Sequence, residues 1–104
     1  MSKAMFNVTL EQDGSTVTIR PKGMLNAHSA SEFQAELARM PEDTTQVILD
    51  CKDLRYTSSA GLRVILALQT RMDKCQGTLV VRNINDILRE TFNDTGFSDF
   101  LTIE

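Results

Sequence analysis

The stretch Asp-Cys-Lys-Asp-Leu-Arg-Tyr-Thr-Ser-Ser-Ala-Gly-Leu-Arg-Val-Ile-Leu-Ala-Leu, residues 50–68, decides the fold of this chain. It follows directly on an apolar run, 47–49, which predicts a strand that is buried on both faces. It ends as a helix whose apolar positions form one stripe at helical spacing: Gly61, Ile65, Leu68 and Met72. Three hydroxyl residues, 57–59, stand at the junction. Hydroxyl oxygens cap the free N–H groups of a helix start, and that end of a helix also favours an added negative charge.

Two strands and a helix are predicted before this stretch. Apolar and polar residues alternate over 6–11 and again over 16–20, and Asp13-Gly14 between them suits a tight hairpin turn. A helix is then expected to begin at Ser29, which forms a capping box with the glutamate three residues later. Pro41 stops that helix, since the residue before a proline avoids the helical region. The apolar stripe of the helix consists of Ala30, Phe33, Leu37 and Met40.

A strand and a helix are predicted after it. Gly77 is a candidate C-cap of the preceding helix, and 79–81 form another buried strand. Asn83 or Asn85 can cap the last clear helix, which ends at Gly96. The apolar stripe of this helix consists of Ile84, Ile87, Leu88 and Phe92. The remaining apolar residues are expected to pack a terminal segment onto the core, with one more strand as an open alternative: Phe97, Phe100, Leu101 and Ile103.

The predicted order of elements is β-β-α-β-α-β-α. Strands that alternate with helices indicate a largely parallel sheet with right-handed crossovers, and the opening hairpin makes that sheet mixed. The sequence therefore predicts a single α/β domain over residues 1–104, packed by three or more helices. The order of the strands within the sheet is left open.

Length and composition favour one soluble domain in the cytoplasm. The chain has 104 residues and a formal net charge of −3, without a basic run, so no nucleic-acid partner is expected. No apolar stretch approaches the roughly 18 residues that span a bilayer, so no direct membrane insertion is expected. Residues 1–7 lack the apolar core of a signal peptide. Cys51 and Cys75 match no metal-binding spacing, and both are expected to be reduced thiols.

The residues that enzymes use are scarce in this chain. Its one histidine, His28, stands just before the first predicted helix, where an exposed loop residue is the expected reading. Neither Ser58 nor Ser59 has the glycine two residues earlier that a nucleophile elbow requires. No Gly-rich phosphate loop ends in Lys-Ser or Lys-Thr. We therefore predict no enzyme activity, no catalytic residue, no metal and no cofactor.

One motif indicates a regulatory protein. The segment Tyr-Thr-Ser-Ser-Ala-Gly-Leu-Arg-Val-Ile-Leu, residues 56–66, resembles the signature of the STAS domain found in bacterial anti-sigma factor antagonists. In that family a Ser-x-Gly-Leu element starts a helix, and a partner kinase phosphorylates its serine. The resemblance makes Ser59 the matching phosphoacceptor. Ser58 stands where the family usually has Asp.

A second motif lies in the loop that enters the first helix. The segment Gly-Met-Leu-Asn, residues 23–26, resembles the family's Gly-x-Leu-Asp loop, with Asn26 where Asp is commoner. The resemblance places this loop beside the serine loop on the partner-binding face. The alternative is that Asn26 only satisfies the backbone of its own loop.

The resemblance implies a protein that switches partners under the control of phosphorylation. The unphosphorylated form would bind an anti-sigma serine kinase with the histidine-kinase-like ATPase fold, phosphorylation of Ser59 would end that contact, and a metal-dependent serine phosphatase would reset it. Exposed residues of the two loops and of the first helical turn, together with Gly61, are expected to form the interface: Asn26, Tyr56, Thr57, Ser58, Gly61, Leu62 and Arg63. The glycine at 61 has a second interpretation, because close packing inside the domain would also exclude a side chain there.

Two other functions fit the same fold. The first is a STAS subunit of a membrane complex, such as a lipid-transport ABC system, that is held by constitutive protein contacts. The second is a STAS domain that binds a small molecule or a nucleotide.

Overall fold

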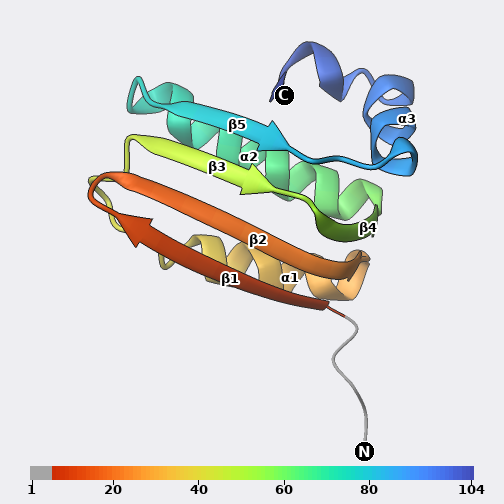
Figure 1. The fold of residues 1–104 in the computed structure, drawn as a ribbon, viewed down its shortest axis with the longest axis horizontal. Coiled ribbons are helices and arrows are strands. Elements are labelled where there is room, and N and C mark those ends of the chain that lie inside the picture. Colours follow the sequence, from red (N-terminus) through yellow and green to blue (C-terminus); the bar gives the residue numbers. More distant parts are fainter. Residues whose placement is uncertain (1–5) are drawn as a thin grey trace, which may run out of the picture.

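The computed structural model describes residues 6–104 (Figure 1). Residues 1–5, and with them most of the segment that was expected to lack a signal peptide, lie outside the described residues. The described chain opens with β1, Phe6–Asp13, and β2, Thr16–Leu25, which form the predicted antiparallel hairpin. Gly14 adopts a φ of 62° in its turn, a left-handed conformation that suits glycine.

A mixed sheet carries the domain, as predicted. Its strands follow the order β1-β2-β3-β5-β6, where β3 is Gln46–Asp50, β5 is Thr78–Arg82 and β6 is Thr102–Ile103. All pairs except β1–β2 are parallel. The sixth strand, β4, Asp53–Thr57, pairs with the second half of β2, on the side where β3 pairs with the first half. No strand was predicted over the residues of β4, which were expected to form a loop.

Helices cover one face of the sheet. Figure 1 shows α1, Ala27–Leu37, and α2, Ser59–Lys74, behind the strands, and within residues 6–104 no helix in front of them. The third helix, α3, Asp86–Asp94, and a short 3-10 turn, Phe97–Asp99, lie beyond the carboxyl end of β5. The core fills the space between the sheet and the helices, and its fully buried side chains include Ile19, Leu25, Phe33, Leu49, Ile65, Met72 and Phe92.

Besides the end of α1, which comes at Leu37 and so before Met40 of its predicted stripe, the helix ends differ from the predictions at two places. The first is the start of α1, where Asn26 is the N-cap and Ser29 occupies the third helical position, so the predicted capping box from Ser29 is wrong. The second is the end of α2, where Gln76 takes the left-handed conformation with a φ of 59°, and Gly77 follows it. The amide of Gly77 donates to the carbonyl oxygen of Met72 over 2.7 Å, and that of Gln76 donates to Asp73 over 3.1 Å, which is a Schellman motif.

Gly77 is therefore not the C-cap residue, although its amide completes the Schellman motif, and its lack of a side chain serves close packing. A Cβ at this position would lie 2.5 Å from the carbonyl oxygen of Thr45. The predicted ends of α3 are confirmed, because Asn85 caps its start and Gly96, with a φ of 77°, follows its last turn. Ile87, which was assigned to the buried stripe of this helix, is 58% exposed.

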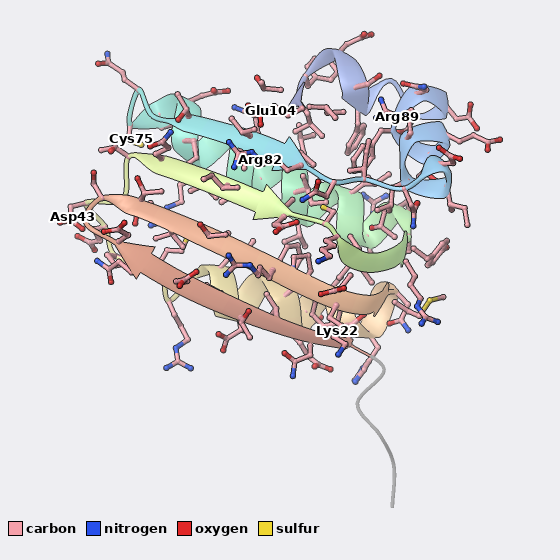
Figure 2. All side chains as sticks on the ribbon, viewed as in Figure 1. Lys22, Asp43, Cys75, Arg82, Arg89 and Glu104 are labelled. Carbon is pink, nitrogen blue, oxygen red and sulfur yellow. The ribbon has the colours of Figure 1, made fainter. Side chains whose placement is uncertain are left out.

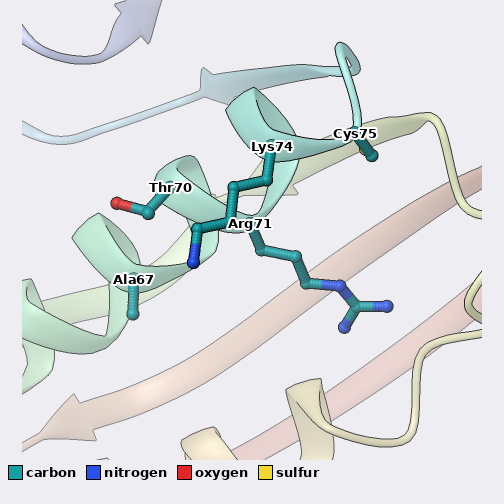
Figure 3. A pocket seen from close by; sticks show the side chains of 5 residues that line it. All are labelled: Ala67, Thr70, Arg71, Lys74 and Cys75. Carbon is teal, nitrogen blue, oxygen red and sulfur yellow. The ribbon is translucent and has the colours of Figure 1, made fainter.

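One long side chain joins the two large helices at their far ends. The guanidinium group of Arg71 in α2 donates to the carbonyl oxygens of Leu37, Met40 and Pro41 over 3.1 to 3.3 Å. Figure 3 shows this side chain extending away from α2. Since the last carbonyl groups of a helix lack partners within it, Arg71 stabilises the end of α1 and fixes it to α2.

Candidate functional site

The starts of α1 and α2 lie side by side at one edge of the sheet. The parallel pairing of β2 with β4 ends with Leu25 opposite Thr57. The next residue on each strand, Asn26 and Ser58, is the N-cap of the helix that follows. The amide of Ser58 donates to the carbonyl oxygen of Leu25 over 2.8 Å. The two motifs found in the sequence are thus neighbours in the fold, as the resemblance implied.

The two serines at the start of α2 have different roles. The hydroxyl oxygen of Ser58 accepts a hydrogen bond from the amide of Gly61 over 3.3 Å, which caps the helix. Ser59 is the first residue of α2 and is exposed. Within residues 6–104 its hydroxyl group makes no side-chain hydrogen bond. The serine that matches the phosphoacceptor is therefore the accessible one of the pair.

Asn26 combines a cap with exposure to solvent. Its side-chain oxygen accepts from the amide of Ser29 over 2.9 Å, and the hydroxyl oxygen of Ser29 accepts from the amide of Asn26 over 2.8 Å. The same hydroxyl group donates to the carbonyl oxygen of Met24 over 2.9 Å. Asn26 therefore satisfies the backbone of its own loop, while its exposed side chain remains accessible to a partner.

Two residues predicted to be exposed at the interface are buried instead. Thr57 and Leu62 are each only 2% exposed, because Thr57 ends the unpredicted strand β4 and Leu62 faces the core. Gly61 is buried as well, and a Cβ there would lie 2.6 Å from Cγ of Leu25 and closer still to Oγ1 of Thr57. The glycine therefore permits close packing inside the domain. The expectation that Thr57 and Leu62 are exposed is wrong, and the burial of Gly61 agrees with the second interpretation of that residue.

The accessible members of the predicted set surround the two helix starts: Asn26, Tyr56, Ser58, Ser59 and Arg63. Tyr56, on β4, is 39% exposed. Arg63 lies on α2 one turn after Ser59 and lines a shallow groove of about 260 Å³ between the two helices, together with Ala27 and Ser31 of α1. His28, expected in a loop, is an exposed residue of the first turn of α1, and its Nε2 lies 3.4 Å from a carboxylate oxygen of Glu32.

The electrostatics of this edge favour an anion. Neither α1 nor α2 has an acidic residue in its first turn. The positive ends of two helix dipoles therefore meet here without a compensating carboxylate from those turns, and Arg63 adds a full positive charge nearby. A negative charge placed on Ser59 would lie within this field.

Sequence reasoning missed one residue that shapes the neighbourhood of the site. The side-chain amide of Asn85 donates to the carbonyl oxygens of Leu54 and Arg55 over 3.4 and 3.3 Å, while its oxygen caps α3. These contacts hold the start of α3, with the exposed Ile87, against β4. A sequence signal existed only for the cap, because the contact with β4 depends on a strand that was not predicted.

Three other kinds of site were considered in the described residues: a reactive cysteine, a metal site and a membrane-spanning helix. The buried position of Cys51 raises the pKa of its thiol to about 12, so this thiol is not a reactive nucleophile. No group of three or more potential metal ligands occurs within residues 6–104. No helix in the same part of the chain is both long and apolar enough to cross a membrane.

Comparisons with known proteins agree with the fold. The STAS domain family matches residues 7–104. BtrV of Bordetella bronchiseptica, described as an anti-sigma factor antagonist, is 38% identical over 77 residues, which are 73% of this chain and 66% of that protein, just under two thirds of its length. The anti-sigma-B factor antagonist of Bacillus subtilis is 26% identical over 94% of this chain and 90% of its own.

Solved structures show the same fold. The anti-sigma factor antagonist SpoIIAA of Bacillus matches in its unphosphorylated form with a TM-score of 0.74 and 22% identity, over 94% of this chain and 87% of that one. Its phosphorylated form matches with the same TM-score and 21% identity, over 94% and 91% of the two chains.

Proposed function

The chain belongs to the STAS domain family and groups with its anti-sigma factor antagonists, and from this premise we propose that it is a partner-switching regulator controlled by phosphorylation of Ser59. In this proposal the protein is a non-enzymatic regulator in the cytoplasm. Its unphosphorylated form binds an anti-sigma serine kinase, the kinase uses ATP to phosphorylate Ser59, and the complex then dissociates. A serine phosphatase restores the binding form.

One observation carries the proposal: Ser59 is exposed at the first position of α2, while Ser58 supplies the cap. A hydroxyl group that makes no hydrogen bond to the rest of the domain can be phosphorylated without loss of a stabilising contact. The existence of a phosphorylated and an unphosphorylated structure of SpoIIAA, which shares this fold, supports the same kind of control here.

The physical effect of the phosphate differs between the domain and its partner. A phosphoserine adds about −1.5 to −2 charges at pH 7. The domain tolerates this charge, because two helix starts without first-turn carboxylates face it. A partner surface packed against the same edge has to desolvate the phosphate or move away from it. Phosphorylation therefore prevents docking while the fold stays intact.

The accessible residues at this edge form the proposed interface: Asn26, Tyr56, Ser58, Ser59 and Arg63. Thr57, Gly61 and Leu62 contribute indirectly, since their packing fixes the start of α2 under that surface. This division separates two kinds of variant. Changes at the exposed residues should alter binding with little effect on stability, and changes at the buried residues should alter both.

Calorimetric titration against the cognate kinase tests the proposal. We expect the phosphorylated protein and Ser59→Asp to bind at least about tenfold more weakly than the parent, which corresponds to about 1.4 kcal/mol. Ser59→Ala should bind and remain bound in the presence of ATP. Thr70→Asp is the matched control, because it adds the same charge to an exposed position of α2 three turns away from the site.

Equal affinities of the phosphorylated and unmodified proteins would remove the switch. That result, together with recovery of an ABC ATPase from the native host instead of a small kinase, would favour a constitutive subunit of a membrane lipid-transport complex.

A further inference from the structure

β1 forms one edge of the sheet, and its outer side is open. Figure 1 shows β1 at this edge, with α1 behind β1 and β2. Within residues 6–104, β2 is the only strand that pairs with β1, and α1 packs against both strands from one face of the sheet. No residue of β1 belongs to the proposed partner-binding surface, so this inference goes beyond the proposed function and does not depend on it.

β1 lacks the features that usually protect an edge strand from other chains. Natural edges are commonly very short, interrupted by a bulge, or marked by proline or lysine. The opposite edge of this sheet, β6, has only two residues. β1 instead has eight residues without proline, lysine or arginine, and it pairs with β2 without a shift of register. An edge with these properties is a template for another strand.

The hydrogen bonds at the two ends of β2 show which backbone groups of β1 are free. The carbonyl oxygens of Ser15 and Leu25 accept from the amides of Gln46 and Ser58 over 3.2 and 2.8 Å, on the side of β3 and β4. Because successive residues of a strand direct their backbone groups to alternate sides, the even-numbered residues of β2 face β1. Each of these lies opposite an odd-numbered residue of β1. The even-numbered residues of β1 therefore direct their amide and carbonyl groups out of the edge: Phe6, Val8, Leu10 and Gln12.

Two copies of β1 are complementary in an antiparallel register that places Thr9 opposite Thr9 of the second copy. In this register Val8 lies opposite Leu10, so the outward-pointing backbone groups meet as hydrogen-bonded pairs. Both of these side chains are half-buried on the face that carries α1, and each would cover the other. On the open face Asn7 lies opposite Glu11, and the two threonines form a cross-strand pair. No like charges lie directly opposite each other.

The neighbouring registers fit less well. A shift by one residue places each free backbone group opposite a residue whose groups already face β2. A shift by two residues toward Asp13 puts Val8 opposite Gln12 and brings the Glu11 side chains of the two copies into diagonal contact. The same shift toward Phe6 leaves only residues 6–10 of β1 paired. Charge and the apolar pattern therefore favour the register that is centred on Thr9.

We propose that β1 is a dimerisation edge, on which a second copy of this chain pairs antiparallel with Thr9 on the two-fold axis. The two sheets then form one continuous sheet, and both α1 helices lie on the same face of it. A two-fold contact is closed, so association ends at the dimer. A single pair of strands is a small contact beside the roughly 1,600 Å² of a standard interface, so we expect a weak dimer that depends on concentration.

Disulfide cross-linking tests the register. Cys75 is exposed and is first replaced by serine, whereas Cys51 is buried and stays; Figure 2 shows Cys75 between α2 and β5, away from β1. Thr9→Cys should then give a covalent dimer with oxidised glutathione, because the Cα atoms of such a pair lie about 4.5 Å apart, within bridging range. Glu11→Cys is the matched control on the same face, since its two copies would lie about 13 Å apart, too far to bridge.

Sedimentation equilibrium and amide hydrogen exchange test association of the full chain without a cross-link. We expect the dimer fraction to rise with concentration, and the amides of Val8 and Leu10 to become protected as it rises, whereas the amide of Thr9 is already protected by β2. Thr9→Glu places two carboxylates opposite each other and should weaken association at least about tenfold. Thr70→Glu, the same change at an exposed position of α2, should associate like the parent.

Four results would overturn the proposal. They are a parent that stays monomeric at every concentration, cross-linking of Glu11→Cys as fast as Thr9→Cys, equal weakening by Thr70→Glu and Thr9→Glu, and protection of the Val8 and Leu10 amides only after the kinase is added. The last result would assign the edge to a strand of another protein. If Thr9→Glu melts below the parent, the comparison of the two cysteine variants decides instead.

Discussion

The amide of Ser58 donates a hydrogen bond to the carbonyl oxygen of Leu25 over 2.8 Å, although 32 residues separate the two in the chain. This bond continues the β2–β4 pairing by one residue and aligns the first turns of α1 and α2. The accessible Ser59 and Asn26 are neighbours for this reason.

Ser59 is expected to be the only phosphorylated residue of the 57–59 segment. Thr57 is buried and Ser58 uses its hydroxyl oxygen as a cap, whereas Ser59 is exposed. Incubation with the cognate kinase and ATP, followed by fragmentation mass spectrometry, locates the phosphate. A phosphate on Ser58 with Ser59 unmodified would contradict the assignment.

Gly61→Ala is expected to destabilise the domain, although alanine favours a helix by about 1 kcal/mol relative to glycine. The new methyl group would overlap the side chains of Leu25 and Thr57, and overpacking of this kind costs about 1–3 kcal/mol. Gly61→Val should be worse still. Urea unfolding measures both, with Ser59→Ala as an exposed control. A Gly61→Ala domain as stable as the parent would show that the neighbours move aside.

Asn26→Ala is expected to lower the free energy of unfolding by about 1 kcal/mol, because it removes the N-cap of α1. Asn26→Asp keeps a capping oxygen and should retain the stability of the parent. The aspartate variant therefore isolates the role of the side chain in binding. If it binds the kinase as the parent does, while Asn26→Ala only loses stability, the cap is the whole contribution of this residue.

Asn83→Gly is expected to raise the pKa of Asp50. The side-chain amide of Asn83 donates to the carboxylate over 2.9 Å and, with the amide of Lys52 and the charge of Arg20, holds this pKa below its ordinary value. Glycine suits the φ of 61° at position 83, so the variant removes the hydrogen bond without straining the backbone.

The sign of the resulting pH dependence follows from the lowered pKa. Ionised Asp50 stabilises the fold above its unfolded pKa of about 3.9, and this contribution is lost as the pH falls through the lower folded value. Asn83→Gly should therefore lose more stability at pH 7 than in acid. Carbon NMR titration of the Asp50 carboxyl group, together with urea unfolding at both pH values, checks the prediction, and an unchanged pKa would contradict it.

Gln76→Gly is expected to stabilise the domain by up to about 1 kcal/mol, because Gln76 holds the left-handed position of the Schellman motif that glycine fills best. Ala67→Gly, at an exposed position inside α2, should lower stability by about 1 kcal/mol. Thermal unfolding of both variants gives the comparison. Equal losses from the two glycines would show that the conformation at 76 carries no strain.

The order of the elements other than β4 and the short β6 could be predicted, because hydrophobic periodicity marks each of them. The hairpin around Gly14, the central strands and α2 all have clear patterns. β4 had none, since only Leu54 and Thr57 of its five residues are buried and their spacing of three does not match a strand. The pairing of β4 with β2 shifts register between Gly23 and Met24, and this shift produces the spacing. Such a shift depends on the tertiary structure and leaves no local pattern.

The candidate site was predictable in its positions but not in its exposures. The resemblance located both loops and singled out Ser59. The burial of Thr57 and Leu62 follows from the contact between β2 and β4, which no local pattern indicates, whereas Gly61 belonged to the predicted apolar stripe of α2. The N-cap of α1 was predicted at Ser29 because Ser29 and Glu32 match the pattern of a capping box. In the structure the Ser29 hydroxyl group donates to the carbonyl oxygen of Met24, and the N-cap is Asn26, three residues earlier.

Arg71 and the Leu25–Ser58 bond lie at opposite ends of the α1–α2 pair, and together they make a signalling domain with little internal freedom. A hinge between the helices would have to break both attachments at once. If Ser59 is phosphorylated as proposed above, the added charge would act on a partner directly at that edge of the domain, and no movement of α1 relative to α2 would be needed to transmit it.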